Sequence, residues 1–335
     1  MIVDWNQVQR NAILLDPDLQ GANSRAYQVN LGSSQYFLKS YKPTHFNRLV
    51  REFKSLTALN SLDVKHIPCV YAVSEENLTL LLSWHNGANP TVIDLNVSRL
   101  LTEFVEELTS LPLQDLPFGN ATDNIISRED VVLSIKGRMQ VASRIQANQI
   151  VNSLQGHIVR RTEDYLNFLS KSRVKLENGF IPSPSDFGTH NLLVESNGDH
   201  VFYDFEYFGF DRPEKLLIDT LIHPKNYWTS DSVETFISFF LKNGYRNGSV
   251  SSTFDPYSIL NWLFIMLNKL GRLTSNLSSD PYTREQQNSS IVILRTEMLA
   301  LVDLYDHVFR DPNNSLGILT SFTLEKLRRK SGESQ

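Results

Sequence analysis

Three side chains in the second half of the chain are of the types that carry out phosphoryl transfer. Asp186 and Asn191 stand five residues apart, and Asp204 follows the apolar stretch Val201–Tyr203. The turn residues Asn197–Asp199 predict a hairpin that would bring Asp204 back towards Asn191. One carboxylate can then accept a hydroxyl proton, while the amide and the second carboxylate supply the oxygen ligands that Mg²⁺ prefers. An isolated Asp and Asn pair is equally typical of an ordinary loop, so the prediction depends on the order of the whole segment.

A lysine and a glutamate nearer the N-terminus supply the matching partners. Lys39 lies in a predicted strand, and Glu52 follows thirteen residues later in a predicted helix. In a nucleotide kinase, a strand lysine neutralises the α- and β-phosphates and a helix glutamate orients it. Taken alone, both would be ordinary surface charges, and it is the downstream segment that favours a nucleotide site. Lys42 and Lys54 are poorer candidates, because Lys42 precedes Pro43 at the strand end and Lys54 falls on the polar helix face.

The first 85 residues predict a small sheet with one helix. Alternating and short apolar runs indicate four strands, and apolar residues at three- and four-residue steps indicate the helix, with Thr44 as its expected N-cap. The expected elements are strands 25–31 and 35–41, helix 44–59, and strands 70–73 and 78–84. The pattern breaks at residues 86–90, which we take as a lobe boundary.

Helices dominate the remainder, apart from a strand-rich segment from Phe180 to Phe205. We expect them at about 96–110, 127–145, 147–170, 214–222, 231–243, 255–274 and 282–309, with a frayed polar tail over 328–335. The expected organisation is a nucleotide-binding lobe, 1–85, and a helical lobe, 86–335. The helical lobe would contain a catalytic loop (181–194) and a metal segment (201–219).

Two of these segments resemble a known family. Ser185–Val194 resembles the catalytic loop of the aminoglycoside phosphotransferase and choline kinase family, and Asp204–Pro213, continuing to Asp219, resembles its metal segment. The resemblance implies a bilobal α+β fold of the protein-kinase-like type, with a small antiparallel sheet and one main helix in the first lobe and a larger, mainly helical second lobe.

The resemblance also implies a role for each residue. Asp186 would be the catalytic base, Asn191 and Asp204 would bind Mg²⁺, Lys39 would contact the phosphates, and Glu52 would hold Lys39. Asp219 would brace the catalytic loop. The hinge would follow the strand Leu80–Leu82, so that Ser83 and His85 lie where the adenine of ATP binds.

Asp186-Phe187-Gly188 also spells the metal-binding triplet of protein kinases. That interpretation needs an Asp-x4-Asn loop upstream, and residues 160–180 contain none, since Asp164 is followed by Leu169. We therefore interpret Asp186 as the base and Asp204 as the metal ligand.

The chain departs from the family pattern at three places. Pro184 stands where the family usually has histidine, which removes a hydrogen bond that braces the loop but no reacting group. The turn Gly21–Arg25 has one glycine, and Ser24 would reach a phosphate there, although an ordinary polar turn is an equal alternative. Arg212 replaces a residue that is commonly acidic or small.

Composition excludes several other classes. The 335 residues carry 32 basic and 37 acidic side chains, a net charge of −5 that does not suit a general nucleic-acid binder. The one cysteine, Cys69, excludes an internal disulfide and a cysteine-based zinc site. No apolar run reaches the length of a membrane span, and Met1–Trp5 do not resemble a secretory signal, so we expect a cytoplasmic protein without membrane or nucleic-acid partners.

These observations predict an enzyme that moves the γ-phosphoryl group of ATP, with Mg²⁺, to a hydroxyl of a small molecule. An aminoglycoside, a choline-like alcohol and a sugar are all open as acceptors, as are GTP in place of ATP and the oligomeric state. The alternative is a nucleotide-binding pseudokinase that acts as a sensor or scaffold. Pro184 and the sparse phosphate turn favour that alternative, and the intact set of site residues opposes it.

Overall fold

The computed structural model describes residues 3–15, 23–112, 119–121, 125, 127–145, 149–172, 179–246, 248–277 and 279–331. The chain divides into two compact units. Unit 1 contains Met1–Thr91, Leu100–Asn124 and Ile181–Asp211, and unit 2 contains Val92–Arg99, Ile125–Phe180 and Arg212–Gln335. The strand-rich segment thus groups with the N-terminal sheet. The proposed lobes 1–85 and 86–335 stay a prediction.

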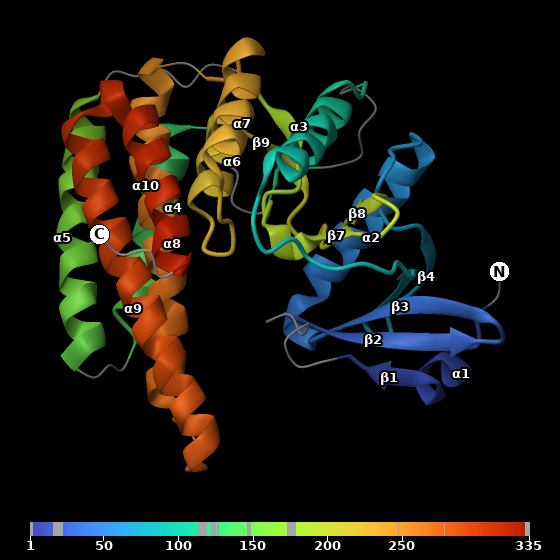
Figure 1. The fold of residues 1–335 in the computed structure, drawn as a ribbon. Helices are drawn as coiled ribbons and strands as arrows, with labels where there is room; N and C mark the ends of the chain where they lie inside the picture. The colour runs from blue at the N-terminus through green and yellow to red at the C-terminus, as the bar shows by residue number, and fades with distance from the viewer. Residues whose placement is uncertain are drawn as a thin grey trace. The chain divides into compact units, whose positions relative to one another are not determined.

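Unit 1 is built on a five-stranded antiparallel sheet with the order β1-β2-β3-β5-β4 (Figure 1). Strand β3 buries residues on both faces, Tyr36 and Leu38 on one and Lys39 and Tyr41 on the other, because successive side chains of a strand point to opposite faces. The short helix α1 (Trp5–Arg10) and strand β1 were not expected, and Val8 of α1 packs into a core with Val29 and Leu38. The strands are β1 (Ala12–Leu14), β2 (Ser24–Leu31), β3 (Ser34–Tyr41), β4 (Val70–Ser74) and β5 (Thr79–Ser83).

The main helix of unit 1, α2 (Phe46–Ser61), begins later than its pattern predicts. Pro43–His45 form a 3-10 turn, so Thr44 lies inside that turn and the expectation that it caps the helix was wrong. Proline has a fixed φ that suits the first position of such a turn. Residues 43–45 therefore form a 3-10 turn, which is wound more tightly than an α-helix, and the α-helix begins after it. The helix buries Leu49, Leu56 and Glu52 on one face.

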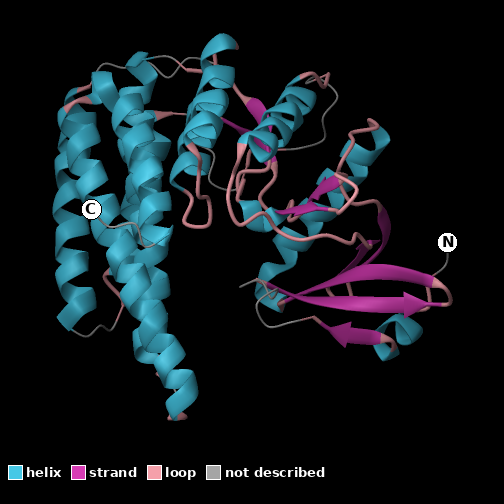
Figure 2. Ribbon diagram, viewed as in Figure 1, coloured by secondary structure: helices cyan, strands magenta, loops and turns pink. Residues whose placement is uncertain are grey.

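The segment Ile181–Asp211 is a closed excursion of the chain. Strand β6 (Ile181–Ser183) pairs antiparallel with β9 (Gly209–Asp211), which was not expected, so the two ends of the excursion are joined. Between them, β7 (Leu192–Val194) and β8 (His200–Phe202) form the expected hairpin. Figure 2 shows these as short strands between longer loops.

An aromatic cluster packs against the segment Ile181–Asp211. Phe104 of helix α3 (Leu95–Thr109) stacks on Phe202 with ring centroids 4.2 Å apart, and it also contacts Phe187 and Phe205. Such pairs add to the burial of large apolar area, so the residues next to Asp186 and Asp204 are fixed by packing.

Unit 2 is helical, and α8 lies at its centre, in contact with α4, α5, α6 and α9 (Figure 1). Helix α8 begins well before residue 255, because Pro256 is accommodated inside the helix instead of starting it. The last helix, α10, includes residues 328–331, so the expectation of a frayed tail was wrong for that part. The helices are α4 (Arg128–Ala142), α5 (Gln149–Lys171), α6 (Pro213–Ile222), α7 (Ser230–Lys242), α8 (Gly248–Ser275), α9 (Pro281–Arg310) and α10 (Ser315–Ser331). Within the described residues, no helix has both the length and the apolar character that crossing a bilayer requires.

The closure at β9 predicts an intolerance of any side chain at Gly209. A Cβ there would lie 2.5 Å from the Ala121 nitrogen and 2.6 Å from the Gly119 oxygen, which are backbone atoms. We expect Gly209→Ala to destabilise the protein by about 1–3 kcal/mol in urea unfolding, the usual range for overpacking. Gly137→Ala is the control, because Gly137 is exposed in α4 with no atom near its Cβ position, and alanine there stabilises by about 0.5–1 kcal/mol. Equal effects of the two substitutions would contradict the prediction.

Candidate active site

Lys39 lies at the centre of a buried group of opposite charges. It extends from β3, where it pairs with Ala26 and Leu80, and its Nζ donates to Glu52 Oε2 at 2.8 Å. Lys39 Nζ also donates to Asp204 Oδ1 and lies 3.5 Å from Glu206 Oε2. Burial alone would lower the pKa of Lys39, but the three carboxylates outweigh it and raise that pKa, so the lysine stays charged. The structure thus brings together Lys39, Glu52 and Asp204, as the sequence analysis expects.

Glu52 is held by three donors. Besides Lys39, the hydroxyl of Tyr41 donates to Oε2 and the backbone N–H of Phe205 donates to Oε1 at 3.2 Å. Burial raises the pKa of Glu52 to about 7, the positive charge of Lys39 opposes the rise, and Asp204 adds to it. Tyr41 was missed in the sequence analysis. Its signal was its position two residues after Lys39 on the same strand, which places both side chains on one face.

The group contains more negative charge than positive. Oxygens of Glu52, Asp204 and Glu206 lie within 4.8 Å of one another around the single ammonium of Lys39. Burial raises the pKa of Asp204, Lys39 opposes this, and the charges of Glu206 and Asp186 add to it. Asp204 also has a left-handed backbone (φ 71°), which costs a non-glycine residue free energy and is common at functional sites.

Glu206 is a site residue that the sequence analysis missed. It is buried, and its Oε1 accepts from Asn23 Nδ2 at 2.7 Å and from Arg48 Nη1 at 2.8 Å. Its Oε2 accepts no hydrogen bond from any described residue. Arg48 also covers the ring of Tyr207 at 4.4 Å, which fixes the guanidinium. The signal was the second carboxylate two residues after Asp204, in the triplet Asp204-Phe205-Glu206.

A divalent cation suits this donor set. Asp204 and Glu206 offer carboxylate oxygens, and an orphaned buried oxygen, Glu206 Oε2, is one of them. Hard oxygen donors with surplus negative charge favour Mg²⁺ over softer metals.

The loop that carries Asp186 is a tight turn. The backbone N–H of Asp186 donates to the carbonyl of Pro184 at 2.8 Å, a three-residue γ-turn whose central residue, Ser185, has φ 63°. Ser183 Oγ accepts from the Ser185 N–H at 3.0 Å. The residue that departs from the family pattern, Pro184, therefore contributes to the turn through its carbonyl and its fixed φ. His190 Nε2 lies 3.6 Å from Asp186 Oδ2.

Asn191 is tied to both acidic residues through the backbone. Its Nδ2 donates to the Asp186 carbonyl at 3.0 Å, so the side-chain oxygen is the atom left to accept a cation. The N–H of Tyr203 donates to the Asn191 carbonyl at 3.0 Å. Asp204 is the next residue after Tyr203, so the hairpin brings it back towards Asn191, as expected. A further amide, that of Asn89, donates to the Leu192 carbonyl at 2.7 Å and to Tyr203 Oη at 3.1 Å. Asn89 lies in residues 86–90, the expected lobe boundary, and these bonds hold the catalytic loop in place.

Ser24 and Ser83, two of the residues proposed for the nucleotide, lie on β2 and β5, the strands on either side of β3. Ser24 is buried at the start of β2, opposite Tyr41, but the rest of its turn (Gly21 and Ala22) lies outside the described residues. Ser83 Oγ lies 2.7 Å from His85 Nε2 and accepts from the Cys69 N–H at 2.9 Å. Burial lowers the pKa of His85.

The last part of the expected metal segment, residues 212–219, belongs to unit 2. Asp219 Oδ2 accepts from Lys215 Nζ at 2.8 Å within α6, and its bracing role stays a prediction. Arg212 is buried, donates from Nε to the Ile125 carbonyl at 3.1 Å and covers the rings of Phe180 and Phe254. Its guanidinium therefore has a packing role in unit 2.

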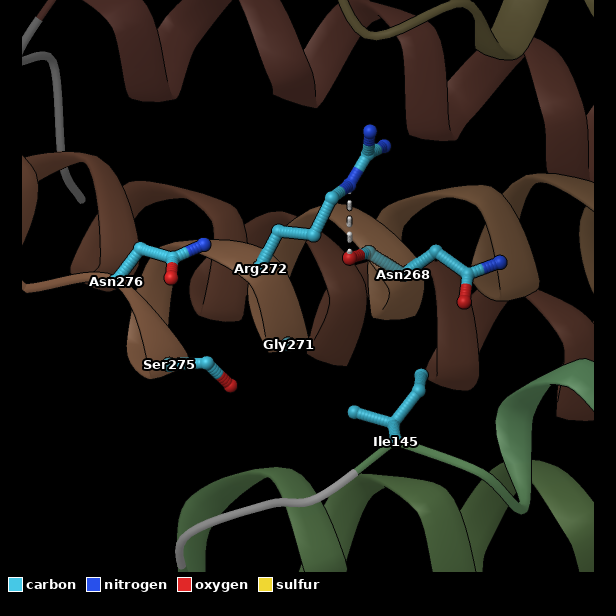
Figure 3. Close-up of a pocket in the computed structure, with 6 residues that line it drawn as sticks. All are labelled: Ile145, Asn268, Gly271, Arg272, Ser275 and Asn276. Atoms are coloured by element: carbon cyan, nitrogen blue, oxygen red, sulfur yellow. Dashed lines mark hydrogen bonds between the residues drawn. The ribbon is translucent and has the colours of Figure 1, made fainter. Parts of the chain in front are cut away.

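A hollow of about 460 Å³ lies elsewhere, between α8 and Ile145, which lies three residues after the end of α4 (Figure 3). Its lining includes Ile145, Asn268 and Arg272, whose Nε donates to the Asn268 carbonyl. The remaining lining residues are Gly271, Ser275 and Asn276. None of the residues proposed from the sequence lines this hollow.

The sheet, the Lys39–Glu52 pair and the loop-and-hairpin segment together define a kinase-like phosphotransferase fold. A family model described as the phosphotransferase enzyme family matches residues 15–243. This match covers more than half of the chain, and the chain belongs to that family. No curated protein matches the chain by sequence.

Solved structures share the fold at low identity. Spectinomycin phosphotransferase in complex with ADP and spectinomycin is 17% identical, with 94% of this chain and 93% of that chain covered and a TM-score of 0.52. The ternary complex of streptomycin, ATP and APH(2″)-IIa is 15% identical, with coverage of 88% and 95% and a TM-score of 0.55. Choline kinase from Cryptosporidium parvum Iowa II is 13% identical, with coverage of 91% and 93% and a TM-score of 0.58. These likenesses confirm the expected bilobal kinase-like fold.

The hydrogen bond from Tyr41 to Glu52 predicts a pH-dependent loss of stability. The folded-state pKa of Glu52 is raised above the ordinary 4.5, so its own ionisation lowers stability as the pH rises from about 4.5 to about 7. The Tyr41 hydroxyl stabilises the ionised form. We expect Tyr41→Phe to cost about 1.5–3 kcal/mol at pH 8.5, the usual range for a hydrogen bond to a charged group, and less at pH 5.5.

Urea unfolding at the two pH values checks this prediction. Tyr36→Phe is the matched control, because Tyr36 is buried on the same strand and its hydroxyl has no hydrogen-bond partner among the described residues. The same cost at both pH values would show that Tyr41 acts through packing alone.

Proposed function

We propose that this protein transfers the γ-phosphoryl group of ATP to a hydroxyl group of a small molecule. The observation that carries the proposal is the contact of the buried Lys39 ammonium with both Glu52 and Asp204. Asp204 directly follows Tyr203, whose N–H donates to the Asn191 carbonyl. A lysine held between a helix carboxylate and a metal-type carboxylate is the arrangement that kinases use to hold nucleotide phosphates. Membership of the phosphotransferase enzyme family supports the same reaction class.

The residues divide the work as follows. Lys39 binds the α- and β-phosphates, and Glu52, fixed by Tyr41 and Phe205, orients it. Asn191, Asp204 and Glu206 would hold Mg²⁺, which neutralises phosphate charge when bound. Asp186 accepts the proton of the acceptor hydroxyl. The oxygen of that hydroxyl bonds to the γ-phosphorus as the bond between the γ-phosphorus and ADP breaks.

ATP as the donor is supported by two of the similar structures, whose complexes contain ADP or ATP. The acceptor belongs to the class of small-molecule alcohols, and aminoglycoside-, choline- and sugar-like acceptors are all compatible with the reaction. We place the enzyme in the cytoplasm, where its exposed free thiol at Cys69 stays reduced.

Removal of the Lys39 ammonium should weaken nucleotide binding. We expect Lys39→Ala to lower Mg-ATP affinity about 10- to 100-fold, because a hydrogen bond to a charged group contributes about 1.5–3 kcal/mol. Lys42→Ala is the control, since Lys42 is exposed just past the same strand. Calorimetric titration of both folded variants makes the comparison, and equal losses would refute the assignment of Lys39.

The two aspartates should fail in different ways. Asp186→Asn keeps size and loses the proton acceptor, so we expect phosphoryl transfer to fall about 10²- to 10⁴-fold with Mg-ATP affinity nearly unchanged. Asp204→Asn removes a negative charge from the cation site, so both transfer and Mg²⁺-dependent ATP affinity should fall. The measurements are ADP release with a panel of alcohols and ATP affinity with and without Mg²⁺.

The same experiment separates an enzyme from a pseudokinase. A wild-type protein that binds Mg-ATP but produces no ADP with any alcohol of the panel would support the sensor or scaffold. If Asp186→Asn turned over like the wild type, the assignment of the base would be wrong.

A further inference from the structure

A second group of ligand-type side chains lies in unit 1 and shares no residue with the candidate active site. His66 follows α2, and Asp199 and His200 lie at the β7–β8 turn. One donor atom from each of the three lies within 4.8 Å of the other two. The group is half exposed to exposed, so an ion from solution has direct access to it.

The backbone fixes these residues against one another. The N–H of Phe202 donates to the His66 carbonyl at 2.8 Å, and His66 Nδ1 lies 3.2 Å from the His200 carbonyl. Asp199 Oδ1 accepts from the His200 N–H at 2.8 Å and lies 3.6 Å from His66 Nδ1. Two segments 134 residues apart are therefore held together with their donor atoms on one side. His66 also has a left-handed backbone (φ 58°), a strained conformation for a residue other than glycine.

The imidazoles are prepared for a metal by their environment. The rings of His66 and His200 stack with centroids 3.8 Å apart and planes 12° apart, and the edge of Phe202 packs against His200. Neutral imidazole is the form that binds metals.

We propose that His66, Asp199 and His200 form a binding site for a divalent transition metal ion of the Zn²⁺ type. Two imidazole nitrogens and one carboxylate oxygen are a common protein ligand set for zinc, with the fourth position open to water. Imidazole donors select Zn²⁺, Ni²⁺ and Cu²⁺ over Mg²⁺ and Ca²⁺, so the ion differs from the one proposed for Asp204. Bound there, it cross-links the segment after α2 to the hairpin that leads into Asp204.

The vicinity adds to the attraction for a cation. His85 Nδ1 lies 4.0 Å from Glu195 Oε1, and the charges of Glu195 and Asp199 both act on His85. The backbone N–H of Glu195 also donates to the Asp199 carbonyl at 2.8 Å, so a second acidic residue belongs to the same turn. The proposal does not rest on the phosphotransferase reaction, because none of its ligands takes part in that reaction.

Titration of the metal-free, full-length protein with Zn²⁺ tests the site. We expect one Zn²⁺ per chain at micromolar affinity, no binding of Ca²⁺ at this site, and a rise in melting temperature with Zn²⁺. His66→Gln and His200→Gln should each lower Zn²⁺ affinity by about tenfold or more. His157→Gln, an exposed histidine of α5, is the matched control and should bind like the wild type.

Two further measurements keep the test independent of folding defects. Asp199→Asn retains an oxygen for the His200 N–H and loses the charge, so it should weaken binding without unfolding the turn. Co²⁺ in place of Zn²⁺ should give visible absorption bands that disappear in His66→Gln and persist in His157→Gln. Absence of Zn²⁺ binding, or equal affinity in the wild type and all ligand variants, would overturn the proposal.

Discussion

The contact of one buried ammonium with three carboxylates is the constraint on which unit 1 depends. Lys39 contacts Glu52, which lies nearby in the sequence on helix α2. It also contacts Asp204 and Glu206, which follow strand β8 much later in the chain. Breaking one member of a buried charge group strands the others in a medium of low dielectric constant, which costs several kcal/mol. The strand, the helix and the loop excursion are therefore held in one register by charge as well as by packing.

The surplus negative charge is what makes this group more than a structural ion pair. A purely structural cluster would balance its charges, whereas here Arg48 and Lys39 face Glu52, Asp204, Glu206 and the nearby Asp186. Burial raises the pKa of Glu52 to about 7, the charge of Lys39 opposes this rise, and the charges of Asp204 and Glu206 add to it. A site of this kind attracts cations, and Tyr41 and Asn23 lower the cost of the surplus by hydrogen bonds to it.

Sequence patterns predicted those elements whose signals are local. The strands around Lys39, helix α2 and the β7–β8 hairpin follow from periodicity and turn residues, and Lys39 and Glu52 follow from their places in those elements. Strand β9 escaped prediction because three residues carry little periodic signal and its partner, β6, is distant in the sequence: the paired residues Ile181 and Asp211 are 30 positions apart. The contacts of Asn89 and Arg48 escaped because a side-chain hydrogen bond between distant segments leaves no trace in local spacing. Helix α8 starts at Gly248, before the expected residue 255, and it contains Pro256, a residue type that usually ends or kinks a helix.

The large sequence separation within the Lys39 group has a consequence for protein synthesis. Lys39 and Glu52 are 13 residues apart, whereas Lys39 and Asp204 are 165 apart. At roughly 5–20 residues per second, about 8–33 s pass on the ribosome between the emergence of the lysine and that of the aspartate. During this interval Lys39 has Glu52 available as its partner, whereas Asp204 and Glu206 have not yet been synthesised. The carboxylates that create the surplus arrive only after the lysine has a partner, so the order of the chain lets the N-terminal layer form before the charge imbalance exists.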